Sequence, residues 1–165
     1  MLVLASTSPQ RRAILEQLRI PFEMIPPRYE EVGDDPVEHA VGKARSVDGG
    51  ESPVLGKPAD PAEARFMLER LSGRTHEVVS GICLRTADWE EVGRAVTAVA
   101  FRQLTAREVV DYVASGEWEG RAGGYAIQGY GASLVERIEG DYLNVVGLPA
   151  ALLLDALSRA PKTRG

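Results

Sequence analysis

Two long strand-like runs joined by a short polar turn constrain the fold of this chain most. Residues 75–84 and 92–101 are rich in apolar and β-branched side chains, and the turn between them contains Asp88. Strands connected by so short a turn pair in the antiparallel direction, which predicts a hairpin. Helix-like segments precede and follow this hairpin. The pattern therefore indicates an α/β or α+β fold with a mixed sheet and excludes a purely parallel sheet.

The other expected elements follow from helix caps and from chain-breaking residues. Asp60 precedes Pro61 in the pattern of a helix start, and Thr105 with Glu108 matches a capping box. Strands are expected at 2–5, 22–25 and 134–138, and helices are expected to start near residues 9, 36, 61, 106 and 149. Glycines and prolines are spread along the chain, so no linker is apparent and a single domain over 1–165 is predicted.

The composition restricts the class of partner. The chain has 165 residues, of which 44% are hydrophobic, and a net charge of −5. An acidic protein is not a general nucleic-acid binder, because the phosphate backbone favours a basic surface, but a small anion in a local basic pocket stays allowed. Cys83 is the only cysteine, so no intrachain disulfide forms and a cytoplasmic location is expected. The apolar stretch 145–154 is interrupted by Gly147 and Pro149, so no membrane span is expected.

The loop before the first expected helix has the residue types of an anion site. Hydroxyls and cations gather there in the order Ser6, Ser8, Gln10, Arg11 and Arg12. A helix start presents free N–H groups and a positive dipole end, which suit a phosphate. The alternative is that Ser8 is only an N-cap and that the arginines lie on a solvated face, since such caps are commonplace.

Two lysines and two glutamates form further candidates. Lys43 and Lys57 could each supply a cation to phosphate oxygens, although a single lysine is usually a surface residue. Lys57 is favoured because Gly56 and Pro58 constrain its backbone. Glu30 and Glu31 could bind Mg²⁺, which proteins usually bind through one or two carboxylates and the substrate. On spacing alone, beside Asp34 and Asp35, a solvated acidic loop is the favoured interpretation of these glutamates.

A glycine-rich stretch from residue 124 to residue 131 lets the backbone approach a ligand closely. Gln128 within it offers a donor and an acceptor that could read a nucleobase edge. A single glycine-rich loop is weak evidence by itself. The two histidines, His39 and His76, lie in unrelated contexts, so a structural or surface role is expected for both.

These motifs resemble the Maf family of nucleoside triphosphate pyrophosphatases along nearly the whole chain. Any one of them could arise by chance, whereas the ordered set is specific. The matching segments are 4–11, 22–27, 30–31, 43–44, 55–58, 71–78, 125–129 and 138–149.

The resemblance implies a fold like that of inosine triphosphate pyrophosphatase, with a mixed sheet flanked by helices and a central cleft. It implies cleavage of a nucleoside triphosphate between the α and β phosphates, with Mg²⁺ or Mn²⁺ as the metal cofactor. The 75–76 and 125–129 segments look closer to members that act on dTTP and UTP than to those that act on 7-methyl-GTP. A homodimer is left open.

The resemblance also assigns roles to residues. Lys43 and Lys57 would be catalytic, Glu30 and Glu31 would bind the metal, and Gln128 would lie near the base. The remaining substrate-binding residues implied are Ser6, Ser8, Gln10 and Arg11.

The sequence departs from the family pattern in two places. Gln10 stands where the family usually has the first of two arginines, so one positive charge is replaced by an amide. Between Ala44 and Leu55 the chain lacks the family's strand ending in Gly-Ala-Asp-Thr, whose aspartate is the presumed general base. Asp48 and Glu51 are the only carboxylates in that interval. The sequence therefore also allows a nucleotide-binding protein without catalysis, or a nonfunctional product.

Overall fold

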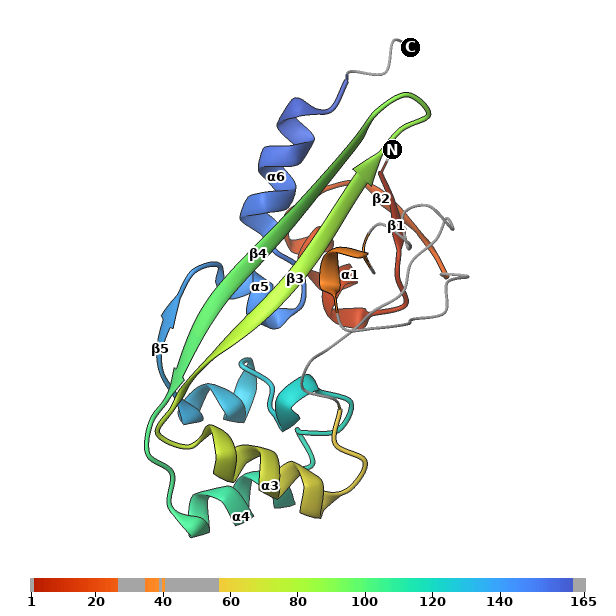
Figure 1. Ribbon diagram of the computed structural model, residues 1–165. Coiled ribbons are helices and arrows are strands. Elements are labelled where there is room, and N and C mark those ends of the chain that lie inside the picture. The colour runs from red at the N-terminus through yellow and green to blue at the C-terminus, as the bar shows by residue number, and fades with distance from the viewer. Residues whose placement is uncertain (1, 27–34, 39, 41–56, 162–165) are drawn as a thin grey trace. The chain divides into compact units, whose positions relative to one another are not determined.

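The computed structural model describes residues 2–26, 35–38, 40 and 57–161. Within them lie a two-stranded sheet of β1 (Leu2–Ala5) and β2 (Phe22–Ile25), and a three-stranded sheet (Figure 1). The order in the three-stranded sheet is β3 (Thr75–Arg85), β4 (Glu90–Phe101) and β5 (Val135–Glu139). The chain divides into two compact units. The first is formed by the described residues within 1–52, 79–96 and 143–165, and the second by those within 53–78 and 97–142. The mixed α/β fold is therefore confirmed, whereas a single domain over 1–165 and a central cleft stay predictions.

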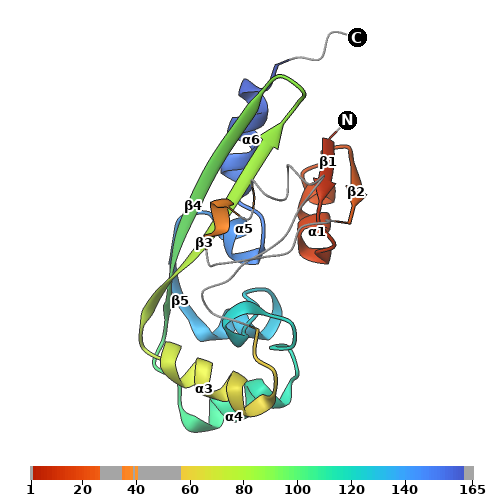
Figure 2. The ribbon, with the colours of Figure 1, turned by 45° about the vertical axis from the view of Figure 1, so that its right-hand side comes forward.

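The first unit begins with a strand, a helix and a second strand. Strand β1 (Leu2–Ala5) leads into α1 (Pro9–Gln17), and β2 (Phe22–Ile25) pairs with β1 in parallel, with Leu2 opposite Phe22 (Figure 2). Ile14 and Leu15 of α1, two consecutive residues, are the buried positions of this helix. They form a core with side chains from the C-terminal part of the chain, namely Leu148, Ala150 and Leu153.

That C-terminal part contributes two helices. The short helix α5 (Tyr142–Val146) is followed by Gly147, and α6 (Ala150–Arg159) starts after Pro149. Leu153 and Ala156 of α6 are buried on its inner side. On the outer side, Arg159 forms ion pairs with Glu91 of β4 and with Asp155 one turn earlier in α6.

The predicted hairpin is present. Strand β3 (Thr75–Arg85) and strand β4 (Glu90–Phe101) are joined by a turn in which Thr86 N donates to Trp89 O at 2.7 Å. Strand β5 (Val135–Glu139) pairs antiparallel with β4, and the register shifts between Ala100 and Phe101. Side chains alternate between the two faces of the sheet. Thr97, Val99 and Phe101 are the buried positions of β4.

The second unit contains two longer helices that contact each other, α3 (Pro61–Leu71) and α4 (Ala106–Ala114). Both start with the predicted caps. Asp60 Oδ1 accepts from Glu63 N at 2.8 Å, and Thr105 with Glu108 forms a reciprocal capping box. Hydrogen bonds to the carboxylate, first from Thr105 N and then from the Arg102 and Thr105 side chains, lower the pKa of Glu108 to about 2.

Two 3₁₀-helices, η1 (Ala122–Gly124) and η2 (Gly129–Leu134), occupy the glycine-rich stretch before β5. The sequence did not predict them, nor α5. Residues 36–38 and 40 are helical, in agreement with the helix expected from Pro36. Several residues of the sequence prediction lie outside the described residues, namely Glu30, Glu31, His39, Lys43, Asp48 and Glu51. No helix in the described ranges has the length and apolar character needed to cross a membrane.

Candidate functional site

The N-terminal loop forms a compact polar cluster at the start of α1. Ser8 is the N-cap of the helix, and its Oγ accepts from Arg11 N at 3.4 Å. Ser6 is buried, with 5% of its surface exposed, and its Oγ accepts from Ser8 N at 3.1 Å. Pro9 is the first helical residue and lacks an N–H group, so it offers no backbone donor to an anion.

Arg11 and Gln10 belong to the same cluster. The Arg11 guanidinium donates from Nη1 to Ser6 Oγ at 3.3 Å and from Nε to Gly147 O at 3.1 Å. Ser8 Oγ donates to Gln10 Oε1 at 3.0 Å. The four predicted substrate-binding residues of the first loop are therefore brought together, and Arg11 fixes this loop to the chain just after α5.

Gly147 is a residue of this cluster that the sequence reasoning missed. Its φ of +145° lies in the region that glycine adopts most easily, and a Cβ there would lie 3.5 Å from Gln10 Cβ. That distance is an ordinary van der Waals contact, so it is the backbone conformation of residue 147, and not a lack of space, that favours glycine. The glycine at the end of the 138–149 motif was the available signal, but the contact joins residues 136 positions apart.

Lys57 is exposed and belongs to the second unit. The next residue, Pro58, is buried, and its Cγ is 3.6 Å from the position of a Cβ on Gly124. Pro58 therefore packs beside Gly124, at the start of the glycine-rich stretch. Lys57 therefore adjoins a residue that packs beside that stretch, while Lys43 lies outside the described residues.

Gln128 is exposed and lies in a turn whose neighbours are fixed. Ile127 before it is 5% exposed, and Gly129 after it has a φ of +77°. The backbone on both sides of Gln128 donates hydrogen bonds to side chains of the segment around the end of α4. Ala126 N donates to Tyr112 Oη at 3.0 Å, and Gly131 N donates to Glu117 Oε1 at 2.7 Å. Gln128 is thus a solvent-facing amide on a well-supported turn.

His76 has a structural environment, in agreement with one of the two roles expected for it. Its Nε2 lies 2.9 Å from Tyr125 Oη, and its ring packs edge-on against Phe101 and Tyr125. Burial lowers the pKa of His76 and raises that of Tyr125, so both are neutral near pH 7. Nδ1 of His76 is buried without a hydrogen-bond partner among the described residues.

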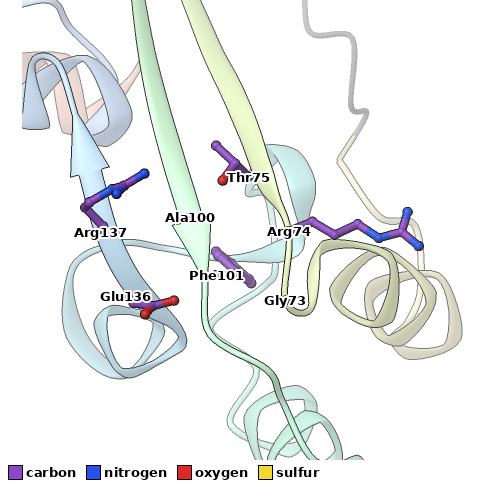
Figure 3. Close-up of a pocket in the computed structure, with 7 residues that line it drawn as sticks. All are labelled: Gly73, Arg74, Thr75, Ala100, Phe101, Glu136 and Arg137. Carbon is purple, nitrogen blue, oxygen red and sulfur yellow. The ribbon is translucent and has the colours of Figure 1, made fainter.

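A separate hollow of about 440 Å³ lies where the three-stranded sheet meets the loop before β3. Its lining residues are Gly73, Arg74, Thr75, Ala100, Phe101, Glu136 and Arg137 (Figure 3). None of the predicted site residues is among them. Figure 3 also shows the Arg74 guanidinium pointing away from Thr75 and Arg137, so the two arginines do not converge on one point.

The described ranges contain no group of three or more His, Cys, Asp or Glu side chains that could bind a metal ion. Glu30 and Glu31, the predicted metal ligands, lie outside these ranges. In the first unit the described residues supply hydroxyls and an arginine, groups of the kind that bind an anion. In the second unit they supply an exposed lysine and an exposed amide.

A family model described as Maf-like protein matches residues 1–160 of the chain. A dTTP/UTP pyrophosphatase from Pyrococcus furiosus is 40% identical, and the alignment covers 99% of this chain and 97% of that protein. The alignment runs over 187 residues, more than the 165 of this chain. A dTTP/UTP pyrophosphatase from Moorella thermoacetica is 44% identical over 95% of this chain and 93% of its own. One from Deinococcus radiodurans is 41% identical, with 96% and 92% covered.

Proposed function

Because the chain belongs to the Maf-like protein family, we propose that it is a nucleoside triphosphate pyrophosphatase that cleaves dTTP and UTP into the monophosphate and pyrophosphate. The observation that carries this proposal is the similarity, along nearly the whole chain, to relatives that are named dTTP/UTP pyrophosphatases. We also propose a cytoplasmic location, which the single cysteine supports.

The triphosphate is proposed to bind at the first loop and at Lys57. Ser6 and Ser8 present hydroxyls at the start of α1, where the helix dipole favours negative charge. Arg11 adds a delocalised cation whose position is fixed by Gly147 O. Lys57 supplies a point charge beside the glycine-rich stretch. Lys43 completes the set by resemblance.

The base is proposed to lie against Gln128. The exposed amide can donate to a carbonyl oxygen of uracil or thymine and accept from the ring N–H of the same base. Its backbone neighbours are fixed by Tyr112 and Glu117. This arrangement supports recognition of a nucleobase edge by a side chain whose backbone needs little reordering on binding.

Mg²⁺ or Mn²⁺ is proposed as the cofactor, with Glu30 or Glu31 as ligands. Oxygen ligands suit these cations, and such sites usually combine one or two carboxylates with substrate phosphates. Bound there, the cation would neutralise charge on the phosphate oxygens. Titration of Mn²⁺ by electron paramagnetic resonance, with dTTP present, tests the assignment. Binding should weaken in Glu30→Gln or Glu31→Gln, and unchanged Mn²⁺ affinity in both variants would refute it.

Turnover is proposed to be slow, because the family's aspartate has no counterpart between Ala44 and Leu55. A positioned general base contributes about 10² to 10⁴ in rate. A general base must come within hydrogen-bonding reach of the attacking water. Asp48 and Glu51 are not expected to replace the aspartate, because neither follows an apolar stretch of sequence that would form a strand and hold it there.

This absence favours one second candidate, a nucleotide-binding protein without turnover. Measuring pyrophosphate release from dTTP, UTP, CTP, 7-methyl-GTP and ITP, beside a binding titration for each, separates the two functions. Release from dTTP and UTP above the rate without protein supports the enzyme. Tight binding with no release supports the binding protein and refutes the enzyme.

The missing base can be tested on its own. Insertion of the family's strand with its Gly-Ala-Asp-Thr sequence between Ala44 and Leu55 should raise turnover at least about a hundredfold. Asp48→Asn and Glu51→Gln, alone or together, should change turnover less than about tenfold. A hundredfold loss from Asp48→Asn alone would mean that the shortened segment has acquired a different base.

A further inference from the structure

The 138–149 segment, which resembles a motif of the family, has no part in the chemistry proposed above. Its Gly147 follows helix α5, and the main-chain oxygen of Gly147 accepts a hydrogen bond from Arg11 Nε at 3.1 Å. Both residues belong to the first unit, although 136 positions separate them in the sequence. The segment therefore reaches the proposed phosphate-binding loop through a backbone carbonyl.

The Gly147 carbonyl lies on a backbone that is fixed by hydrogen bonds and by packing. Gly147 N and Leu148 N both donate to Leu143 O, each at 2.9 Å. The Leu148 side chain is 7% exposed and belongs to a hydrophobic core with Ile14 and Leu15. Those two residues lie on α1, the helix that also carries the arginine. The oxygen that accepts and the guanidinium that donates are therefore attached to one packed core.

The conformation of Gly147 decides where its oxygen points. Its φ of +145° lies in a region that residues with a side chain rarely adopt. A Cβ at this position would lie 3.5 Å from Gln10 Cβ, an ordinary contact, so space is not what requires glycine. Because φ rotates the carbonyl carbon about the N–Cα bond, a residue that leaves this conformation displaces the oxygen that Arg11 contacts.

Two acceptors set the plane of the Arg11 guanidinium. Besides the contact of Nε with Gly147 O, Nη1 donates to Ser6 Oγ at 3.3 Å. Ser6 is buried, and its Oγ also accepts from Ser8 N at 3.1 Å, so this second acceptor is held in place as well. A guanidinium is planar, and it binds phosphate best when its fork of N–H groups has the right direction. Fixing the plane before the ligand arrives reduces the entropy lost on binding.

We propose that Gly147 is a positioning residue, whose main-chain carbonyl orients the Arg11 guanidinium for the phosphates of the nucleotide. This inference rests on the proposed function, in which the first loop binds the triphosphate. Gly147 itself touches no phosphate. It acts through Arg11, and its contribution is the direction of a cation on a long side chain with several rotatable bonds.

Nuclear magnetic resonance of the full chain tests the contact directly. In proton–nitrogen correlation spectra, the Nε–H resonance of Arg11 is the one that disappears in Arg11→Lys. A hydrogen bond to a fixed acceptor should make this proton exchange with water at least about fivefold more slowly than in free arginine. Gly147→Ala should remove most of this protection, because alanine there leaves the conformation that presents the oxygen.

Calorimetric titration measures the consequence for binding, with Mg²⁺ and α,β-imido-dUTP, an analogue that resists cleavage between the α and β phosphates. Gly147→Ala should lower the affinity for the analogue about threefold or more, and should have no further effect in an Arg11→Ala background. Arg11→Lys keeps the charge but loses the planar fork, so it should lower the affinity as well.

Gly140→Ala is the matched control for Gly147→Ala. Gly140 also has a positive φ, +124°, but it is exposed and belongs to the second unit. The same chemical change at this position should leave both the exchange of the Arg11 proton and the affinity for the analogue unchanged.

The outcomes that overturn the proposal are distinct. Exchange of the wild-type Arg11 proton as fast as in free arginine overturns it, even if Gly147→Ala does not fold. Unchanged exchange in a folded Gly147→Ala chain also overturns it, as does an equal loss of affinity with and without Arg11. Full affinity in Arg11→Lys would mean that the direction of the cation does not matter. A wild-type chain that binds no analogue refutes the proposed function itself, whereas binding that Gly147→Ala leaves unchanged refutes only the role of Gly147.

Discussion

Replacing Gly131 with alanine should destabilise the second unit through one defined close contact. The added Cβ would lie 1.9 Å from Ala126 O and 2.8 Å from Ala126 C, both backbone atoms that cannot rotate away. Gly131 does not have a positive φ, so backbone strain is not the cause. The backbone at residue 131 must instead move away from that at residue 126, and this movement lengthens the hydrogen bond from Gly131 N to Glu117.

The magnitude follows from these two effects. Forcing extra volume into a packed site costs about 1 to 3 kcal/mol, and weakening a hydrogen bond to a carboxylate adds to this cost. We expect Gly131→Ala to lower the free energy of unfolding by about 3 kcal/mol, a large part of the 5 to 15 kcal/mol typical of a domain.

Urea unfolding followed by circular dichroism measures this loss, with Gly120→Ala as the matched control. Gly120 has a φ of +69° but no atom within 4 Å of its Cβ position, so alanine there carries backbone strain without a clash. That strain costs about 1 kcal/mol. If Gly131→Ala unfolds at the same urea concentration as the wild type, the close approach of residues 126 and 131 is wrong.

Three further predictions concern stability and binding. Thr105→Ala should lower the free energy of unfolding by about 1 kcal/mol, because it removes the N-cap of α4. An unchanged midpoint temperature of thermal unfolding would mean that the capping box with Glu108 contributes nothing to stability. The folded-state pKa of His76 lies below its unfolded value of 6.5, so the unfolded chain binds the proton first and stability should fall as the pH drops below about 6.5. His76→Gln should reduce this dependence below about pH 6.5, and an equal slope would assign it to other groups. Lys57→Ala should weaken dTTP binding about tenfold, and more than Lys43→Ala does, because Pro58 fixes the backbone of Lys57. Equal and negligible effects of the two substitutions in a binding titration would mean that both lysines are surface residues.

The elements that the sequence predicted well are those with local signals. Asp60 and Thr105 cap the predicted helices, and β1, β2 and the hairpin lie close to their predicted bounds, because caps, prolines and apolar runs act over a few residues. The helix α5 was not predicted, since five residues between two glycines give too short a periodic pattern.

The residues that cluster at the first loop could be predicted from the sequence, whereas the contacts between distant segments could not. Ser6, Ser8, Gln10 and Arg11 adjoin one another in sequence, so their clustering follows from one loop and one helix start. The contact between Arg11 and Gly147 does not follow from sequence, because it depends on how distant segments pack. The same holds for Glu117, whose partners lie 13 and 14 residues further along the chain.

Phosphorus NMR of the products formed from dTTP tests the central claim most directly. The proposed function predicts dTMP and pyrophosphate in equal amounts, formed slowly with Mg²⁺ present, and more slowly still after Arg11→Ala. Formation of dTDP and orthophosphate would contradict it, because that would place cleavage at the β–γ linkage. Unchanged dTTP after prolonged incubation, at a protein concentration well above the dissociation constant, would contradict any role as a pyrophosphatase.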